Sequence, residues 1–208
     1  MDVKQAYNNW ADKYDTNQNK TRDLEAIALK ETLADLKFNN CLEIGCGTGK
    51  NTSWLITKAK HITAIDLSNE MLAKAKEKIK ADNVVFKQSD ITKEWNFSDK
   101  PFDLVTFSLV LEHIENLKDI FRKTAGVMIP NGYVYIGELH PFKQYTGTKA
   151  RFDSEEGQQI VNCYNHNISD FIQSALQNNF EIVNINEHFD NHDQTTIPRI
   201  LTILLKKK

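Results

Sequence analysis

The chain has 208 residues, of which 40% are hydrophobic and 26% charged, and its formal net charge is −2. These values are typical of a globular protein, and we expect residues 1–208 to form a single domain. A nearly neutral chain lacks the positive charge of most nucleic-acid-binding proteins, so no nucleic-acid partner is expected. The apolar run over 200–205 is far too short to cross a bilayer, so no membrane partner is expected either.

The cysteines and the N-terminus predict a cytoplasmic protein. Cys41, Cys46 and Cys163 form neither a CxxC pair nor a disulfide framework, so we expect reduced thiols and no metal site. The first five residues lack the apolar segment of a signal peptide. The sequence leaves open whether the protein is a monomer or a homodimer.

Short apolar runs alternate with helical patterns along the chain. Strands are expected at 41–44, 61–66, 84–86, 102–107, 133–137, 180–185 and 200–205, and helices at about 23–37, 50–58, 69–80, 117–125 and 169–176, with Ser68 and Ser169 as N-caps. An Asn131-Gly132 turn precedes the fifth strand. The N-terminal segment 1–22 and the segment 141–167 show little regular pattern.

The alternation of strands and helices predicts parallel strands joined by right-handed crossovers. No helix separates the last two strands, so they should pair in antiparallel fashion. The expected fold is therefore a Rossmann-like three-layer α/β sandwich, with a seven-stranded, mostly parallel sheet and one antiparallel strand near the C-terminus. Ligands bind such sheets outside the carboxyl ends of the strands. Residues 1–22 should form a lid there, and 141–167 an insertion on the substrate side.

A glycine-rich loop follows the first strand. It runs Glu43-Ile44-Gly45-Cys46-Gly47-Thr48-Gly49, and Asp66 ends the second strand 21 residues after Gly45. Such a loop lets a ligand approach the backbone, and a carboxylate at that distance can accept ribose hydroxyls.

These two features would also suit the binding of a nicotinamide dinucleotide, but proteins that bind it have the fingerprint G-x-G-x-x-G. Here the spacing is G-x-G-x-G, and Lys50 occupies the position of the last fingerprint glycine. Glu43 at the loop would repel a pyrophosphate but suits a cationic ligand.

Five motifs in chain order resemble those of class I S-adenosylmethionine-dependent methyltransferases, in the branch that acts on small molecules. They are Glu43-x-Gly45-x-Gly47-x-Gly49, Asp66, Asp90 in Gln88-Ser89-Asp90-Ile91, Phe102–Val105 with Leu111–Ile114, and Met128–Tyr133. Tyr14-Asp15 also resembles the Y-D pair that opens many of these enzymes. The resemblance covers roughly residues 7–205.

The resemblance implies S-adenosyl-L-methionine as cofactor and a small molecule as methyl acceptor. Asp66 would bind the ribose, and Asp90 would receive the adenine amino group. The cofactor-binding residues expected from it are Tyr14, Glu43, Gly45, Cys46, Gly47, Gly49, Asp66, Leu67, Met71, Asp90, Ile91, Ser108 and His113. Two alternatives stay open: a non-catalytic protein that binds this cofactor, and a nicotinamide-dependent oxidoreductase.

Residues near the fifth strand and the segment 141–167 are candidates for the acceptor side. Glu138 and His140 follow that strand, and His166 precedes a helix. Histidine is the side chain best suited to take a proton near neutral pH. We therefore hypothesise that His140 or His166, with Glu138, orients or deprotonates the acceptor.

Three further polar residues have a structural interpretation. Glu112 and His113 either brace the turn after the fourth strand or belong to the site. Asp103 is expected only to form hydrogen bonds near its strand.

Overall fold

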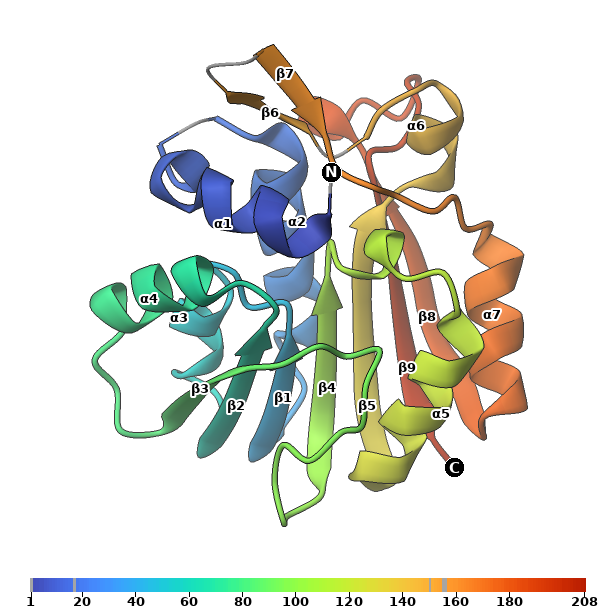
Figure 1. Cartoon of the computed structure of the whole chain (residues 1–208). Helices are drawn as coiled ribbons and strands as arrows, with labels where there is room; N and C mark the ends of the chain where they lie inside the picture. The colour runs from blue at the N-terminus through green and yellow to red at the C-terminus, as the bar shows by residue number, and fades with distance from the viewer. Residues whose placement is uncertain (1, 17, 150, 155–156) are drawn as a thin grey trace.

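The computed structural model describes residues 2–16, 18–149, 151–154 and 157–208. Its main sheet has seven strands in the order β3-β2-β1-β4-β5-β9-β8 (Figure 1). Their bounds are β1 (Asn40–Ile44), β2 (His61–Asp66), β3 (Val84–Gln88), β4 (Phe102–Ser108), β5 (Met128–Leu139), β8 (Phe180–His188) and β9 (Ile200–Lys207).

The strand directions agree with the sequence expectation. The pairs β1–β2, β1–β4, β2–β3 and β4–β5 are parallel, whereas β9 runs antiparallel to both β5 and β8. A mostly parallel sheet with one reversed strand near the C-terminus is therefore confirmed. Asn131, before the regular part of β5, has φ of +64°, a left-handed conformation that asparagine adopts more readily than most residues.

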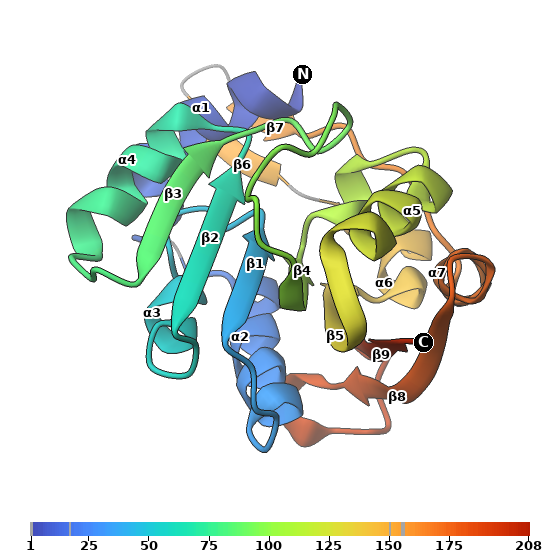
Figure 2. The same ribbon diagram turned by 90° about the horizontal axis from the view of Figure 1, so that it is seen from below.

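Helices cover both faces of this sheet. They are α1 (Val3–Tyr14), α2 (Lys20–Leu33), α3 (Thr52–Leu55), α4 (Asn69–Lys78), α5 (Leu117–Val127), α6 (Pro141–Tyr145) and α7 (Ile168–Gln177), with 3-10 turns η1 (Leu111–His113) and η2 (Asp190–His192). Seen from below, α5 and α7 lie on the opposite side of the sheet from α2 and α3 (Figure 2).

Neighbouring residues of the central strands pack into two separate cores. In β1, Cys41 packs with leucines of α2 and α3, whereas Leu42 packs in the core that contains the apolar faces of α5 and α7. In β4, Leu104 and Val105 divide between the two cores in the same way. Because successive side chains of a strand point to opposite faces, this division gives the three-layer arrangement.

The helix ends show how local sequence sets the boundaries. Ser68 caps α4 as expected, since its hydroxyl accepts the Met71 N–H at 3.1 Å. The cap of α7 is Asn167 rather than Ser169, because Asn167 and Asp170 form a reciprocal capping box. The helix expected at 23–37 begins earlier, at Lys20, where the preceding asparagine side chain caps it.

Two segments are more regular than the sequence predicted. Residues 3–14 form the helix α1, whose Ala6, Trp10 and Ala11 pack against Met71 of α4 and Val161. Within 141–167 the structure has α6 and a hairpin of β6 (Arg151–Ser154) and β7 (Gly157–Ile160). The helices α1 and α6 and the strands β6 and β7 lie above the carboxyl ends of the parallel strands (Figure 1).

Candidate active site

The glycine loop joins β1 to α3 at the carboxyl edge of the sheet. Gly45, Gly47 and Gly49 have φ of +72°, +54° and +84°, a region that residues with a side chain rarely adopt. A Cβ on Gly45 would lie 2.1 Å from Cγ2 of Val110, so this glycine allows the close packing of two loops. A Cβ on Gly47 would meet no heavy atom within 4 Å, so space stays open above the middle of the loop.

Asp66 ends β2 beside this open space. Its Oδ2 accepts the Gly47 N–H and its Oδ1 accepts the Ser68 N–H, each at 2.8 Å. Burial raises the pKa of the Asp66 carboxyl, and hydrogen bonds from Ser68, Gly47 and Leu67 oppose that shift. The carboxylate is thus held at the loop with a fixed orientation.

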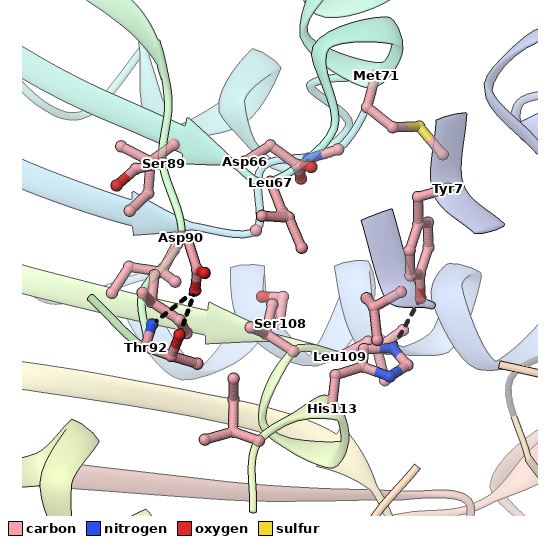
Figure 3. Close-up of a pocket in the computed structure, with 18 of the residues that line it drawn as sticks. Tyr7, Asp66, Leu67, Met71, Ser89, Asp90, Thr92, Ser108, Leu109 and His113 are labelled. Atoms are coloured by element: carbon pink, nitrogen blue, oxygen red, sulfur yellow. Dashed lines mark hydrogen bonds between the residues drawn. The ribbon is translucent and has the colours of Figure 1, made fainter. Parts of the chain in front are cut away.

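A cavity of about 270 Å³ opens over Asp66, and we call it the Asp66 cavity (Figure 3). Ten of the expected cofactor-binding residues line it: Tyr14, Gly45, Gly47, Asp66, Leu67, Met71, Asp90, Ile91, Ser108 and His113. Asp90 lines it too, and its Oδ1 accepts the Thr92 N–H at 2.9 Å and the Thr92 hydroxyl at 2.6 Å. Residues that are spread between positions 14 and 113 of the sequence therefore line one cavity.

The remaining three expected residues lie elsewhere. Glu43 and Cys46 line a smaller cavity of about 40 Å³, called here the Glu43 cavity. Gly49 lines neither cavity, because its Cα faces Ile79 at the end of α4: a Cβ there would lie 2.7 Å from the Ile79 Cδ1 atom. The third glycine thus serves packing between the loop and α4.

Glu43 does not present a free anion to the loop. Its Oε2 accepts the Thr52 hydroxyl at 2.6 Å, and burial raises its pKa to about 8. The side chain is therefore mostly protonated near neutral pH. The Glu43 cavity offers a neutral acid, rather than the negative charge that the sequence suggested.

Two cations, Arg22 and Lys50, also line the Glu43 cavity. Lys50 forms an ion pair with Asp23. The Arg22 guanidinium donates to the Tyr14 carbonyl and lies 5.0 Å from the Tyr14 ring centroid. Arg22 also lies 3.5 Å from Asp23, so both cations share that carboxylate, and the Arg22 guanidinium lies beside Tyr14.

Tyr7 of α1 connects the N-terminal helix to η1. Its hydroxyl lies 2.9 Å from Nε2 of His113 (Figure 3). Nδ1 of His113 lies 2.9 Å from the Asn162 carbonyl. A carbonyl only accepts, so Nδ1 carries the proton and Nε2 accepts from Tyr7. Tyr7 was not among the residues expected at the site, although Tyr7, Trp10 and Tyr14 share the spacing of one helix face.

A third cavity, of about 320 Å³, is lined by residues of α1 and η1 and is called the Glu112 cavity. Glu112 of η1 lines it and is only 6% exposed, and within the described residues its Oε2 has no hydrogen-bond partner. Burial raises the pKa of the Glu112 carboxyl, whereas the charge of His113 and a hydrogen bond with Cys163 oppose that shift. The three aromatic residues of α1 named above line the same cavity.

All three cavities share two residues, Tyr14 and Leu109. Leu109 follows β4 with φ of +57°, and its N–H donates to the Gly137 carbonyl at 2.8 Å. A leucine in the left-handed region is held there at an energetic cost, and such positions cluster at functional sites. The Asp66, Glu43 and Glu112 cavities thus converge on one point beside Tyr14 and Leu109.

The three residues expected to act on the acceptor lie outside this convergence. Glu138 is 1% exposed, and its Oε1 accepts the N–H groups of Val110 and Leu111 at 2.9 and 2.8 Å. Burial raises its pKa to about 8. Glu138 therefore supports the turn that carries Glu112, and it lines none of the three cavities.

The two histidines have structural partners as well. His140 is fully buried, caps α6 by accepting the Phe142 N–H, and donates from Nε2 to Glu187 at 2.9 Å. His166 donates from Nε2 to the Ile114 carbonyl at 2.7 Å and lines a separate hollow beside α5 and α7. Tyr7 and Glu112 line the converging cavities, whereas these two histidines do not.

The Asp66 cavity fits the adenosyl cofactor that the sequence resemblance implies. The position above Gly47 is free of protein atoms, as a ligand lying against the backbone requires. Asp66 and Asp90 place two carboxylates along one hollow. The Arg22 guanidinium in the adjoining Glu43 cavity can meet a carboxylate. Contact of each residue with the cofactor stays a prediction.

The described residues include no helix that is both long and apolar enough to cross a membrane. In the same part of the chain, no group of three or more His, Cys, Asp or Glu side chains could hold a metal ion.

Known proteins provide a comparison that is independent of the site geometry. A family model described as "Methyltransferase domain" matches residues 42–136. An uncharacterized methyltransferase of Emericella nidulans is 28% identical over 88% of this chain and 77% of its own length. The ubiquinone biosynthesis O-methyltransferase of Aeromonas salmonicida is 30% identical, but the match spans only 48% of this chain and 42% of that enzyme.

A solved structure agrees in fold. The N-methyltransferase NodS of Bradyrhizobium japonicum, in complex with S-adenosyl-L-homocysteine, superposes with a TM-score of 0.74 over 100% of this chain and 99% of its own, at 18% identity. The nicotinamide alternative finds no support, because the family model that matches describes methyltransferases. Residues 42–136 are therefore similar to a methyltransferase domain, and the chain shares the fold of S-adenosylmethionine-dependent methyltransferases.

Proposed function

We propose that this chain transfers the methyl group of S-adenosyl-L-methionine to a small molecule bound in the Glu112 cavity. The observation that carries the proposal is the convergence of three cavities at Tyr14 and Leu109. A cofactor in the Asp66 and Glu43 cavities and an acceptor in the Glu112 cavity would meet at that point. Methyl transfer needs such a meeting point because its main requirement is proximity and alignment.

The cofactor would be held by residues from four parts of the chain. Asp66 would accept the ribose hydroxyls and Asp90 the adenine amino group, as the sequence resemblance implies. Arg22 would bind the carboxylate at the amino-acid end, since its guanidinium brings positive charge to the Glu43 cavity. The loop at Gly47 leaves the space in which the cofactor lies against the backbone.

When bound, the cofactor supplies a methyl group that is already activated on a sulfonium. The protein's own contribution is therefore to bind, to orient and to exclude water. Tyr7, Trp10 and Tyr14 cover the meeting point with aromatic rings; the Tyr7 and Trp10 centroids are 5.9 Å apart, and those of Trp10 and Tyr14 are 4.9 Å apart. The Tyr7–His113 hydrogen bond links these rings of α1 to η1.

The size and cover of the Glu112 cavity favour a small acceptor. A volume of about 320 Å³ lies in the range of pockets for small molecules. The residues at the end of β4 are Phe107-Ser108-Leu109-Val110, which do not resemble the N-P-P-Y or D-P-P-Y motif that holds a flipped base. We therefore favour a small molecule over a nucleic-acid base.

The proposal is tested with cofactor that carries a labelled methyl group. The purified protein is incubated with this cofactor and with two fractions of a cell extract, one of small molecules and one of macromolecules. Label should pass to a compound in the small-molecule fraction. Transfer only to macromolecules would refute the proposed acceptor class. Binding of the cofactor without transfer to either fraction would favour the non-catalytic alternative.

A further inference from the structure

Resting on the proposed function, we propose that the acceptor is a small amine that also carries an acidic group. The amino group would lie against Glu112 and the aromatic rings of α1, and the acidic group would lie toward Lys20 and Lys149. The Glu112 cavity itself carries the argument, because a buried acid and exposed bases line it together.

The buried end of this cavity suits a cationic nitrogen. Glu112 follows Leu109 by three residues, is 6% exposed, and has an Oε2 atom without a hydrogen-bond partner among the described residues. A buried carboxyl oxygen without a donor is costly, and an ammonium N–H would satisfy it. The sequence and the fold around η1 thus leave one acceptor atom for the ligand to complete.

Aromatic rings complete this buried end. Tyr7, Trp10 and Tyr14 all line the cavity, and their centroids lie 4.9 to 6.4 Å from one another. Aromatic rings attract a cation, and three of them beside a carboxylate are a typical setting for an ammonium group. A carboxylate placed here would instead lie next to the Glu112 carboxyl and would be repelled by its ionised form.

The solvent side of the cavity has the opposite charge. Lys20 and Lys149 line the cavity and are exposed, so their ammonium groups mark the side that opens to water. Arg199 lines the cavity as well, but its guanidinium donates two hydrogen bonds of 2.6 Å to Asp190. We therefore expect the two lysines, rather than Arg199, to bind the acidic group of a ligand. An acidic group on the acceptor would therefore be attracted to this side.

Glu112 can also take the proton that the reaction must release. An ammonium nitrogen has no lone pair, so one N–H proton passes to the Glu112 carboxylate before the nitrogen forms its bond to the methyl carbon. The C–S bond of the cofactor breaks at the same time as the N–C bond forms, and its electron pair stays on sulfur. The product is an N-methylammonium group, and the Glu112 proton then returns to solvent.

The first test identifies the product. Labelled product from the small-molecule fraction is characterised by mass spectrometry and NMR, and the methyl group should be on nitrogen in a compound with a carboxylate, phosphate or sulfonate group. A methyl group on oxygen, sulfur or carbon, or an N-methyl product without an acidic group, would overturn this inference and leave the proposed function standing. Absence of any labelled small molecule would count against both.

The second test measures binding without turnover. Protein saturated with S-adenosylhomocysteine is titrated calorimetrically with amino acids, hydroxy acids and amines of two to six carbons. At least one amino acid should bind at least tenfold more tightly than its matched hydroxy acid and amine. Equal binding of the three classes, or preference for the hydroxy acid, would contradict the inference.

Variants then locate the amino group of the ligand. Glu112→Gln should weaken the preferred amino acid at least tenfold, with cofactor affinity within about twofold of the wild type. Glu115→Gln is the matched control, because Glu115 is exposed, lies three residues after Glu112 and does not line the Glu112 cavity. This control should change neither affinity.

A conservative variant covers the case in which Glu112→Gln does not fold. Glu112→Asp keeps the charge on a shorter side chain and should weaken the amino acid about threefold or more. Unchanged affinity in a folded Glu112 variant would overturn the assignment.

A double variant locates the acidic group of the ligand. Replacing Lys20 and Lys149 together by Gln should weaken the amino acid at least threefold but leave the matched amine unchanged. Lys60→Gln, an exposed lysine outside all three cavities, is the control and should affect neither ligand. Equal weakening of the amino acid and the amine would show that the lysines do not meet an acidic group.

Discussion

The Tyr7 hydroxyl lies 2.9 Å from Nε2 of His113, although 106 residues separate the two in the chain. This hydrogen bond joins α1 to the turn after β4, and both residues line the Asp66 cavity. Burial raises the pKa of Tyr7 well above its ordinary value, so the hydroxyl stays protonated and keeps donating to His113.

Tyr7→Phe should therefore loosen α1 while the sheet stays intact. A net hydrogen bond contributes about 0.5–1.5 kcal/mol, so we expect cofactor affinity to fall roughly threefold to tenfold. Calorimetric titration with S-adenosylmethionine measures the change. Tyr133→Phe, in β5 away from the cavities, is the control and should bind as the wild type does. Equal affinities for all three proteins would show that the contact does not hold the cover closed.

Asp66→Ala should weaken cofactor binding by about two orders of magnitude or more. Charge-assisted hydrogen bonds contribute about 1.5–3 kcal/mol each, and the carboxylate would accept two from the ribose. The variant also loses the contacts to Gly47 and Ser68, so thermal unfolding must be measured beside the titration. Glu70→Gln, at the exposed start of α4, should change neither quantity. A folded Asp66→Ala protein with unchanged affinity would remove this residue from the site.

The two glycines of the loop should respond differently to alanine. Gly45→Ala brings its Cβ into Val110 and should lower the free energy of unfolding by about 2–4 kcal/mol. Gly47→Ala meets no protein atom, so it should cost only about 1–2 kcal/mol for its positive φ, yet abolish cofactor binding. Gly126→Ala in α5 is the control. Normal binding by Gly47→Ala would show that the space above Gly47 is not the cofactor site.

Glu43 should make stability depend on pH. Burial raises its pKa to about 8, above the ordinary 4.5, so the folded state favours the protonated form. The resulting stabilisation is complete below pH 4.5 and is lost as the pH rises through 8. The Gln side chain of Glu43→Gln does not titrate, so this variant should not lose that stabilisation. The difference in unfolding free energy, variant minus wild type, should therefore be about 1–3 kcal/mol larger at pH 8 than at pH 5. Denaturant unfolding at both pH values measures this, with the exposed Glu31→Gln as control; parallel curves would refute it.

Asp103 should matter for stability alone. Its Oδ2 and Oδ1 accept the N–H groups of Asn39 and Asn40, each at 2.8 Å, at the start of β1. Asp103→Ala should lower the free energy of unfolding by about 1–3 kcal/mol, with cofactor affinity within about twofold of the wild type. The exposed Asp99→Ala is the control. A large loss of affinity in folded Asp103→Ala would contradict this structural role.

The sequence by itself determined which segments form the main strands and which of them run parallel or antiparallel. Apolar runs such as 41–44 and 102–107 can be recognised as strands from the residues within them. The crossover helices between strands then impose parallel pairing. The glycine loop and Asp66 could be found from the sequence because their positions depend only on predicted strands. The loop begins directly after β1, and Asp66 is the last residue of β2. Because those ends meet at one edge, ten of the expected residues line one cavity.

Only the tertiary structure pointed to the acceptor side that we propose. Sequence position placed Glu138 and His140 just after the expected strand 133–137, but Glu138 accepts the Leu111 N–H of η1 and His140 donates to Glu187. Tyr7 and Glu112 meet the same cavity because α1 packs over the strand ends, a contact between segments more than 100 residues apart. Local pattern carries no information about such a contact, since it depends on how α1 packs against α4 and η1.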